Sequence, residues 1–389
     1  MLEALLESES KREKIERERT SEMTISKNNL TKDIEVYYEK GSRNVKCFCG
    51  VICNKSIIPH IVEKHPEAWN DWCKDFVKQY NKGLSYKRIM NLYRDRNGRL
   101  LFTWTVVERY IKRMIEKGES KLLVRQKEKI KTWRPEKFKV EKTSVWDFPK
   151  RGDWAVHQSD YRGNWPPQLP RNLILKYSGE GDLILDPFVG GGTTLIEAWL
   201  ENRKSIGIDI NPIAEQVSKQ RILEMELKSK ESINMHLSQD YKPIIVRDDA
   251  RNVLKIMSKI GLGTDSIDLL LMHPPYMDAL RYTELEKEDL SHLHDVNLFC
   301  QEIQGIARDL FSLLKSGKKC ALLIGDIRKN GRMIPLGFRV MECFLKEKYD
   351  LLDIIMKTQH RDQSTEFYYN KPMIEYLIAH EYLFIFQKP

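Results

Sequence analysis

The sequence predicts a doubly wound α/β domain over residues 151–389, preceded by a basic and mostly helical domain. From residue 182 onward, short apolar runs alternate with segments that carry apolar residues at helical spacing, which is typical of a sheet covered by helices. A glycine-rich turn separates the first apolar run from an amphipathic helix. The basic residues are concentrated before residue 151. These observations predict the fold class and the division of the chain.

Seven strands are expected in the α/β domain. They correspond to the runs at 183–186, 205–209, 243–247, 268–272, 320–325, 352–357 and 382–386. The segment between the first two runs, TTLIEAWLENR, is apolar at helical spacing. The first four strands can therefore be connected as parallel, right-handed crossovers.

Length and composition narrow the class of protein. A chain of 389 residues fits two domains, and 41% hydrophobic residues without a run of about 20 apolar positions predicts no membrane span. The start of the chain lacks the basic and apolar pattern of a secretory signal, so we expect a cytoplasmic location. Seven cysteines in such a chain are too sparse for a disulfide framework.

The charge of the chain is unevenly distributed. Residues 41–150 carry 26 Lys+Arg against 12 Asp+Glu, or +14, whereas residues 1–40 carry −2 and residues 151–389 carry −3. Such a concentration is typical of a domain that binds a polyanion, although a basic solvated surface without a partner is the alternative. We expect a charged arm at 1–40, the basic domain at 41–120 and a basic linker at 121–150.

The segment Asp186-Pro-Phe-Val-Gly-Gly-Gly-Thr-Thr194 is the strongest single indication of a ligand site. Glycines such as Gly190 and Gly192 let the backbone approach a ligand, and the helix start at Thr193 offers free N–H groups. Asp209, at the end of the next strand, is placed where a ribose is bound in nucleotide-binding sheets. The loop lacks the lysine of a P-loop, and acidic Asp186 favours a ligand with positive charge over a pyrophosphate.

Residues 169–214 resemble the cofactor half of the DNA amino-methyltransferases, which modify adenine N6 or cytosine N4, and match that family's DPFxGxGTT pattern. The resemblance implies a Rossmann-like seven-stranded methyltransferase sheet and S-adenosylmethionine as cofactor. The resemblance also implies which residues bind this cofactor. Asp209 would hold its ribose, Asp249 would lie near its adenine amino group, and Arg171 and Asn172 would close over its methionine part. With the loop residues, the expected cofactor-binding set is Asp186, Phe188, Gly190, Gly192, Thr193, Asp209, Asp249, Arg171 and Asn172.

The sequence His273-Pro274-Pro275-Tyr276 follows the fourth strand and resembles the family's (Asp/Asn/Ser)-Pro-Pro-Tyr catalytic loop. An exocyclic amine is a poor nucleophile, and acceptors aimed at its N–H groups free its lone pair for attack on a methyl group. The carbonyl of Pro274 can be one acceptor, and Tyr276 offers a face on which a flipped base stacks. His273 departs from the pattern: it either accepts while neutral or takes no part. Here the cofactor loop precedes the catalytic loop, which weakens any transfer of the target base.

The basic domain holds two further patterns. Cys49, Cys53, His60 and His65 form a set that suits tetrahedral Zn²⁺, with Cys47 as a spare thiolate. The alternative, in which Cys53 is packed and His65 lies on a helix surface, stays open.

Two amphipathic segments that follow resemble a helix-turn-helix, with 103–116 as the recognition helix. In this interpretation Arg109, Lys112 and Arg113 face DNA. A purely structural helix pair is the alternative.

The sequence therefore predicts site-specific methylation of double-stranded DNA, with adenine N6 favoured over cytosine N4 as the target. Two other functions stay open: methylation of an RNA base, as in tRNA, and DNA binding by an inactive regulator in which His273 is the lesion. No nuclease motif is present in the sequence, so modification alone is the simplest assignment. The sequence does not show whether a restriction endonuclease completes a restriction-modification system. The oligomeric state is not predicted.

Overall fold

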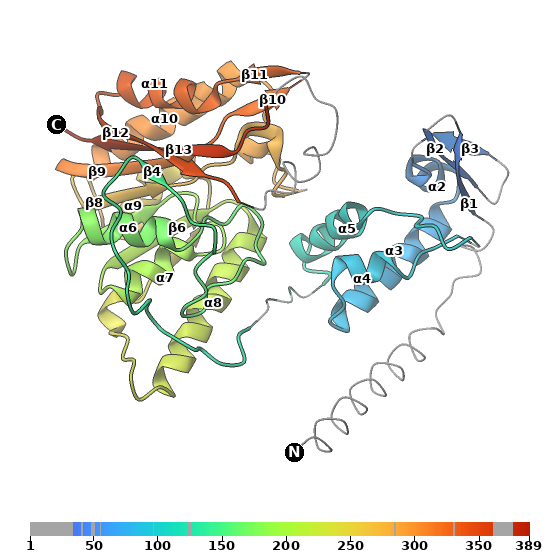
Figure 1. Ribbon diagram of the computed structural model, residues 1–389, viewed down its shortest axis with the longest axis horizontal. Coiled ribbons are helices and arrows are strands. Elements are labelled where there is room, and N and C mark those ends of the chain that lie inside the picture. The colour runs from blue at the N-terminus through green and yellow to red at the C-terminus, as the bar shows by residue number, and fades with distance from the viewer. Residues whose placement is uncertain are drawn as a thin grey trace. The chain divides into compact units, whose positions relative to one another are not determined.

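The computed structural model describes residues 34–39, 42–47, 51–54, 56–95, 97–120, 122, 124, 126–283, 285–329, 331–360 and 376–389. Its contacts divide the chain into two compact units, Met1–Lys121 and Leu122–Pro389 (Figure 1). Most of the charged arm expected at 1–40 lies outside the described residues.

The second unit is built on an eight-stranded sheet with the strand order β4-β12-β13-β9-β8-β5-β6-β7. The strands β7, β6, β5, β8 and β9 are parallel to one another, and β13 is antiparallel to β9 and β12. Their bounds are β4 Val145–Trp146, β5 Leu183–Asp186, β6 Lys204–Asp209, β7 Ile244–Arg247, β8 Ile267–Met272, β9 Leu314–Ile324, β12 Asp350–Thr358 and β13 His380–Gln387. All seven predicted strands are present, so the Rossmann-like seven-stranded sheet is confirmed, and β4 adds an eighth strand at one edge.

Helices cover both faces of this sheet (Figure 1). Side chains of β8 alternate between the faces: Leu270 and Met272 pack in one core with α9, α10 and α11, and Leu269 and Leu271 pack in another with α6 and α7. A strand buried on both faces reads as a continuous apolar run. The helix bounds are α6 Gln168–Tyr177, α7 Thr193–Leu200, α8 Pro212–Lys230, α9 Val253–Lys259, α10 Val296–Leu313 and α11 Leu336–Lys346, with a small hairpin of β10 Ile327–Lys329 and β11 Arg332–Ile334.

The expected linker at 121–150 differs from the observed structure. Ile130, Trp133 and Phe138 pack against the core formed by α7 and α8, and β4 pairs with β12. The basic charge of this segment suggested an exposed linker, but its few apolar and aromatic side chains bury enough surface to attach it to the α/β unit.

The first unit begins with an antiparallel sheet of β1 Glu35–Glu39, β2 Ser42–Lys46 and β3 Ile52–Asn54, and continues with α2 Ile58–Lys64, α3 Pro66–Asn81, α4 Tyr86–Met90 and α5 Trp104–Glu116. Edge-to-face aromatic contacts among Trp72, Phe76 and Phe102 form the core of the helical part. Arg43 donates to the carbonyls of Leu100 and Leu101, which attaches the sheet to the loop before α5. The described elements of this unit are thus mostly helical, as the sequence predicted, with a small sheet that the sequence did not predict.

Among the described residues, no helix has the length and apolar character needed to cross a membrane.

Candidate active site

The glycine loop between β5 and α7 has a backbone that only glycine adopts readily. Gly190 and Gly192 have φ angles of 50° and 81°. A Cβ at Gly192 would also lie 3.0 Å from the Cβ of Ser218 on α8. The loop therefore packs closely against α8 and turns directly into the first turn of α7.

Two carboxylates, buried Asp186 and half-buried Asp209, hold this loop in different ways. Asp186 ends β5 and accepts from the backbone N–H of Phe188 at 3.0 Å and from the hydroxyl of Thr194. Asp209 ends β6 and accepts from the backbone N–H of Gly190 and of Asn211, both at 2.9 Å. Burial raises the pKa of Asp186 and of Asp209 to about 7, against the lowering effect of those hydrogen bonds.

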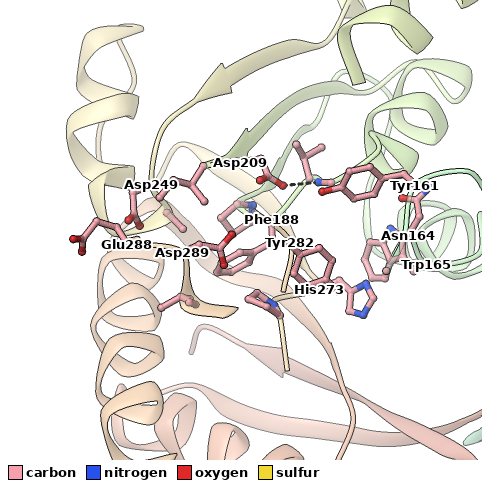
Figure 2. A pocket seen from close by; sticks show the side chains of 18 residues that line it. Tyr161, Asn164, Trp165, Phe188, Asp209, Asp249, His273, Tyr282, Glu288 and Asp289 are labelled. Atoms are coloured by element: carbon pink, nitrogen blue, oxygen red, sulfur yellow. Dashed lines mark hydrogen bonds between the residues drawn. The ribbon is translucent and has the colours of Figure 1, made fainter. Parts of the chain in front are cut away.

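A pocket opens where β5, β6 and β8 end, and it encloses about 700 Å³, part of it open to solvent. This is the side of the sheet where the strand order reverses, which is the usual ligand position in such sheets. Figure 2 shows Asp249 and Glu288 at one end of the pocket and His273 and Trp165 at the other. Its described lining is Tyr161, Gly163, Asn164, Trp165, Pro187, Phe188, Val189, Gly190, Asp209, Ile210, Asp249, Ala250, His273, Pro275, Tyr282, Glu288, Asp289 and Leu290.

The charge of the pocket is acidic. Four carboxylates line it, from Asp209, Asp249, Glu288 and Asp289, and the described lining contains no lysine or arginine. A pyrophosphate would meet net repulsion here, whereas a cationic ligand with hydroxyl groups would be stabilised.

The catalytic loop is attached to the antiparallel strands of the sheet by a chain of hydrogen bonds. The Tyr276 hydroxyl lies 3.0 Å from Nε2 of His273 and donates to Oε1 of Glu381 on β13 at 2.7 Å. Nζ of Lys357 on β12 donates to Oε2 of the same carboxylate at 2.8 Å. Burial raises the pKa of Glu381, but Lys357, His273 and Tyr276 together hold it below its usual range, so the carboxylate is ionised.

This network determines the tautomer of His273. An ionised Glu381 only accepts, so the single hydroxyl proton of Tyr276 points to it. Nε2 of His273 must then donate to the Tyr276 oxygen, which leaves the lone pair of Nδ1 to accept. Burial lowers the pKa of His273 to about 4, so the ring is neutral near pH 7. The ring of Trp165 is stacked against it, with centroids 5.8 Å apart.

Arg171 and Asn172, on α6, are not among the residues that line the pocket, which differs from the prediction. Arg171 is buried and donates to Oε2 of Glu197 at 2.9 Å, while Trp154 and His157 hydrogen-bond the other oxygen of that carboxylate, each at 2.6 Å. Asn172 accepts from the backbone of Glu141 at 2.7 Å. These contacts lie inside the fold, so both residues hold α6, α7 and the preceding segment together.

Other residues predicted for the site lie behind the pocket wall and support the residues that line it. Asp186, Gly192, Thr193, Pro274 and Tyr276 do not line the pocket. The Thr193 hydroxyl is hydrogen-bonded to the side-chain amide of Asn164 at 2.9 Å, which joins the start of α7 to the wall of the pocket. Tyr276 has its hydroxyl tied to Glu381, and a Cβ at Gly325 would lie 2.9 Å from its ring. Its half-buried ring packs against the core of the sheet and does not line the pocket, which differs from the stacking face that was predicted.

The sequence analysis missed several lining residues. Tyr161, Asn164 and Trp165 come from the segment before α6, and Tyr282 and Asp289 come from the loop after Tyr276. The run Asp-Tyr-Arg-Gly-Asn-Trp-Pro-Pro, with two aromatic residues and two prolines next to α6, was the available signal.

The first unit brings together only part of the predicted metal set. Ligand atoms of Cys47, His60 and His65 lie within 4.8 Å of one another. The group found among the described residues does not include Cys53, and Cys49 lies outside them.

On α5, Arg109 and Arg113 are exposed, as predicted for a helix that faces DNA. The side chain of Lys112 is 22% exposed and forms an ion pair with Glu108 at 2.9 Å. Its charge is already compensated within the helix, which differs from the prediction.

Comparison with known proteins identifies the protein family to which this chain belongs. A family model described as "DNA methylase" matches residues 27–220. The Type II methyltransferase M.MjaII of Methanocaldococcus jannaschii is 31% identical over 173 residues, which cover 40% of this chain and 30% of that protein. The DNA adenine methyltransferase YhdJ of Escherichia coli is 40% identical over 68 residues, which cover 18% of this chain and 23% of that protein. The chain belongs to the DNA amino-methyltransferase family.

As a member of this family, the chain has S-adenosylmethionine as its cofactor. The chain spans less than a third of the length of either curated relative. Among solved structures, a putative DNA modification methylase from Thermus thermophilus, complexed with S-adenosyl-L-methionine, is 25% identical; the match covers 36% of this chain and 51% of that one, with a TM-score of 0.27.

Proposed function

We propose that this chain transfers a methyl group from S-adenosylmethionine to an exocyclic amino group of a base in double-stranded DNA, with adenine N6 favoured over cytosine N4. The observation that carries the proposal is one pocket that joins the acidic cofactor side, at Asp209, to His273 and Pro275 of the catalytic loop. Both functions of a methyltransferase, binding the donor and activating the acceptor, are then served by adjoining walls.

The residues of the pocket fit S-adenosylmethionine. Phe188 would line the cofactor site, Asp209 would hold the ribose hydroxyls, and Asp249 would lie near the adenine amino group, as the family resemblance implies. The described part of the lining is acidic and contains no lysine or arginine, which suits a sulfonium and an amino group and disfavours phosphates. When bound, this cofactor supplies an electrophilic methyl group.

The catalytic loop would activate the target amine through two acceptors. Nδ1 of His273, which lines the pocket, would accept from one N–H of the amine. The carbonyl of Pro274, which precedes the lining residue Pro275, stays the second acceptor that the sequence predicts. Drawing both protons away frees the nitrogen lone pair for in-line attack. Tyr276, Glu381 and Lys357 hold the histidine ring in the accepting tautomer. The base would be rotated out of the duplex, and Trp165 or Tyr282 of the lining offers an aromatic face for it.

We propose that the first unit binds the duplex. It carries most of the basic excess of residues 41–150, and α5 exposes Arg109 and Arg113. Helix-turn-helix recognition by α5 stays part of this proposal, as does the modification role in a restriction-modification system. The cytoplasmic location predicted from the sequence accords with a DNA substrate and stays a prediction.

The two aspartates of the glycine loop provide a matched test of the cofactor site. Asp209→Asn is expected to weaken S-adenosylmethionine binding about 10–100-fold, the range of one charge-assisted hydrogen bond. Asp186→Asn should leave the affinity within about threefold, because Asp186 does not line the pocket and its two hydrogen bonds suit an amide. Isothermal titration calorimetry measures both affinities. Equal losses in the two variants would contradict the assignment.

The affinity for S-adenosylmethionine should also depend on pH, and the variants of Asp209 and Asp186 test the origin of this dependence. The pKa of Asp209 is about 7, so protonation below that pH removes the anionic acceptor, and wild-type affinity should fall from pH 8 to pH 6. The decrease should persist in Asp186→Asn and disappear in Asp209→Asn. A decrease that disappears only in Asp186→Asn would reverse the two roles.

DNA binding by α5 has its own matched pair. Arg113→Gln is expected to lower affinity for duplex DNA and to reduce the slope of log K against log salt by about 1, as for one lost phosphate contact. Lys112→Gln should change the slope less, because Lys112 is paired with Glu108. Fluorescence anisotropy over a range of salt concentrations measures both slopes. A larger effect at Lys112 than at Arg113 would argue that another face of the unit meets DNA.

Two other functions have distinct outcomes. An RNA-base methyltransferase would label tRNA in preference to a DNA duplex when both are present with the labelled cofactor. An inactive DNA-binding regulator would bind cofactor and duplex without turnover. Neither has a specific structural observation in its favour, since His273 is positioned by a complete hydrogen-bond network.

A further inference from the structure

The first unit contains a cluster of metal-ligating side chains that methyl transfer does not require. Sγ of Cys47 and one imidazole nitrogen from each of His60 and His65 lie within 4.8 Å of one another. Cys47 is buried, and both histidines are half-buried. We propose that Cys47, His60 and His65 bind Zn²⁺. Of the set predicted from the sequence, His60 and His65 belong to this group, Cys53 does not, and Cys49 lies outside the described residues.

Local structure brings these three side chains together. Cys47 directly follows β2, and its N–H donates to the carbonyl of Val51 at 2.8 Å, which extends the β2–β3 ladder by one residue. His60 lies within α2, and His65 ends that helix with φ of −137° and ψ of 54°. The two imidazole rings meet edge to face, with centroids 5.3 Å apart. The end of the hairpin and the end of the helix therefore converge on one point.

The donor types and spacing favour zinc among the common metals. Zn²⁺ binds thiolate and imidazole in tetrahedral sites, whereas Mg²⁺ and Ca²⁺ need oxygen ligands. Tetrahedral geometry with ordinary Zn–S and Zn–N bonds separates ligand atoms by roughly 3.4–3.8 Å. The observed limit of 4.8 Å requires only small side-chain adjustments to reach it. These three side chains supply three of the four positions.

Cys53 is the cysteine to compare with Cys47 as a metal ligand. It lies on β3 opposite Val45, on the same hairpin and only six residues from Cys47, yet it does not belong to the group of converging ligands. Sequence spacing alone cannot separate these two thiols. The pairing register separates them, because it puts Cys47 at the end of β2 that approaches α2.

The metal would stabilise a small part of the fold. Few apolar side chains of the sheet and of the segment around α2 are buried, among them Ile34, Val36, Val45, Ile57 and Ile61. A core of this size usually needs a metal or a disulfide to remain folded. Zinc at this point would join the β2–β3 hairpin to α2 within the basic unit.

The experiment measures metal content of the full chain, purified with a non-thiol reductant and without chelator. The expected result is about one zinc ion per chain by inductively coupled plasma mass spectrometry. Cys47→Ser should lose most of the zinc, and Cys53→Ser, the matched control, should keep it. Wild-type chain without stoichiometric zinc, or loss in Cys53→Ser with retention in Cys47→Ser, would overturn the proposal.

A second readout keeps the test valid if Cys47→Ser folds poorly. Zinc is removed from the wild-type chain and from Cys53→Ser, and Co²⁺ is added. We expect tetrahedral cobalt absorption with a thiolate-to-cobalt charge-transfer band in both proteins, and its loss when His65→Asn is tested. Thermal unfolding of the first unit should shift upward with metal. Absence of the charge-transfer band in wild type would contradict ligation by Cys47.

Discussion

His273→Ala is expected to lower kcat about 10²–10³-fold, the loss typical of removing one preorganised hydrogen-bonding group from a reacting centre. The affinity for S-adenosylmethionine should change little, because His273 lies at the opposite end of the pocket from Asp249. The measurement is single-turnover methylation of a DNA duplex at saturating cofactor. His273→Asn is the informative control. The side-chain oxygen of asparagine can accept a hydrogen bond, and asparagine is one of the residues found at this position in the family pattern.

The pH dependence of this step follows from the low pKa of His273. The histidine accepts only while neutral, and burial lowers its pKa to about 4, so the single-turnover rate at saturating cofactor should stay constant through pH 7 to 6 and fall only as pH approaches 4. His273→Asn should remove that fall. A rate that titrates near pH 6.5 and loses this dependence in His273→Asn would show that the ring is not shielded in the complex.

Glu381→Gln separates positioning from direct action. The amide keeps the shape of the side chain but no longer obliges the Tyr276 hydroxyl to donate, so the tautomer of His273 is no longer imposed. We expect a lower kcat with unchanged affinity for cofactor and duplex. Equal rates for wild type and Glu381→Gln would remove Glu381 from the account and leave the assignment of His273 intact.

Glu197→Ala is expected to destabilise the α/β unit by about 3–5 kcal/mol, the cost typical of removing one partner of a buried ion pair. The carboxylate is fully buried and accepts from Trp154, His157 and Arg171. Its loss removes the acceptor of Trp154 and His157 and one of the two carboxylates that contact Arg171. Urea denaturation followed by circular dichroism measures the change in the free energy of unfolding.

Glu201→Ala is the matched control for this prediction. Glu201 also contacts Arg171 at 2.9 Å, but its side chain is 14% exposed and lies at the end of α7. Glu201→Ala should lower the free energy of unfolding less than Glu197→Ala does, because water can replace part of the contact. Equal destabilisation by the two changes would argue that Arg171 is the important member and that Trp154 and His157 contribute little.

The fold could be predicted where its pattern is local. Each of the seven predicted runs is a strand because buried parallel strands are continuous apolar segments bounded by turns. The two-residue strand β4 has no such pattern: it exists because Trp146 is buried against the sheet and pairs with β12, more than 200 residues later. Its pairing depends on tertiary packing, which sequence periodicity does not reveal.

The candidate site, like the fold, could be predicted where its residues form a contiguous motif. The glycine loop and the His-Pro-Pro-Tyr loop are contiguous motifs, and the structure brings both to one pocket. Glu381 could not be found from the sequence, because its importance arises from β13 lying between β9 and β12. Arg171 was assigned to the cofactor by motif position, whereas burial beside Glu197 decides its actual contacts.

The central claim is methyl transfer to a DNA amino group, and one measurement tests it most directly. The purified chain is incubated with S-adenosylmethionine carrying a labelled methyl group and a mixed-sequence DNA duplex, with His273→Ala in parallel. The DNA is digested to nucleosides and analysed by mass spectrometry. We predict label in N6-methyladenine, strongly reduced in the variant; label in N4-methylcytosine would keep the reaction and change the base. An absence of label in DNA, despite bound cofactor and duplex, would contradict the account.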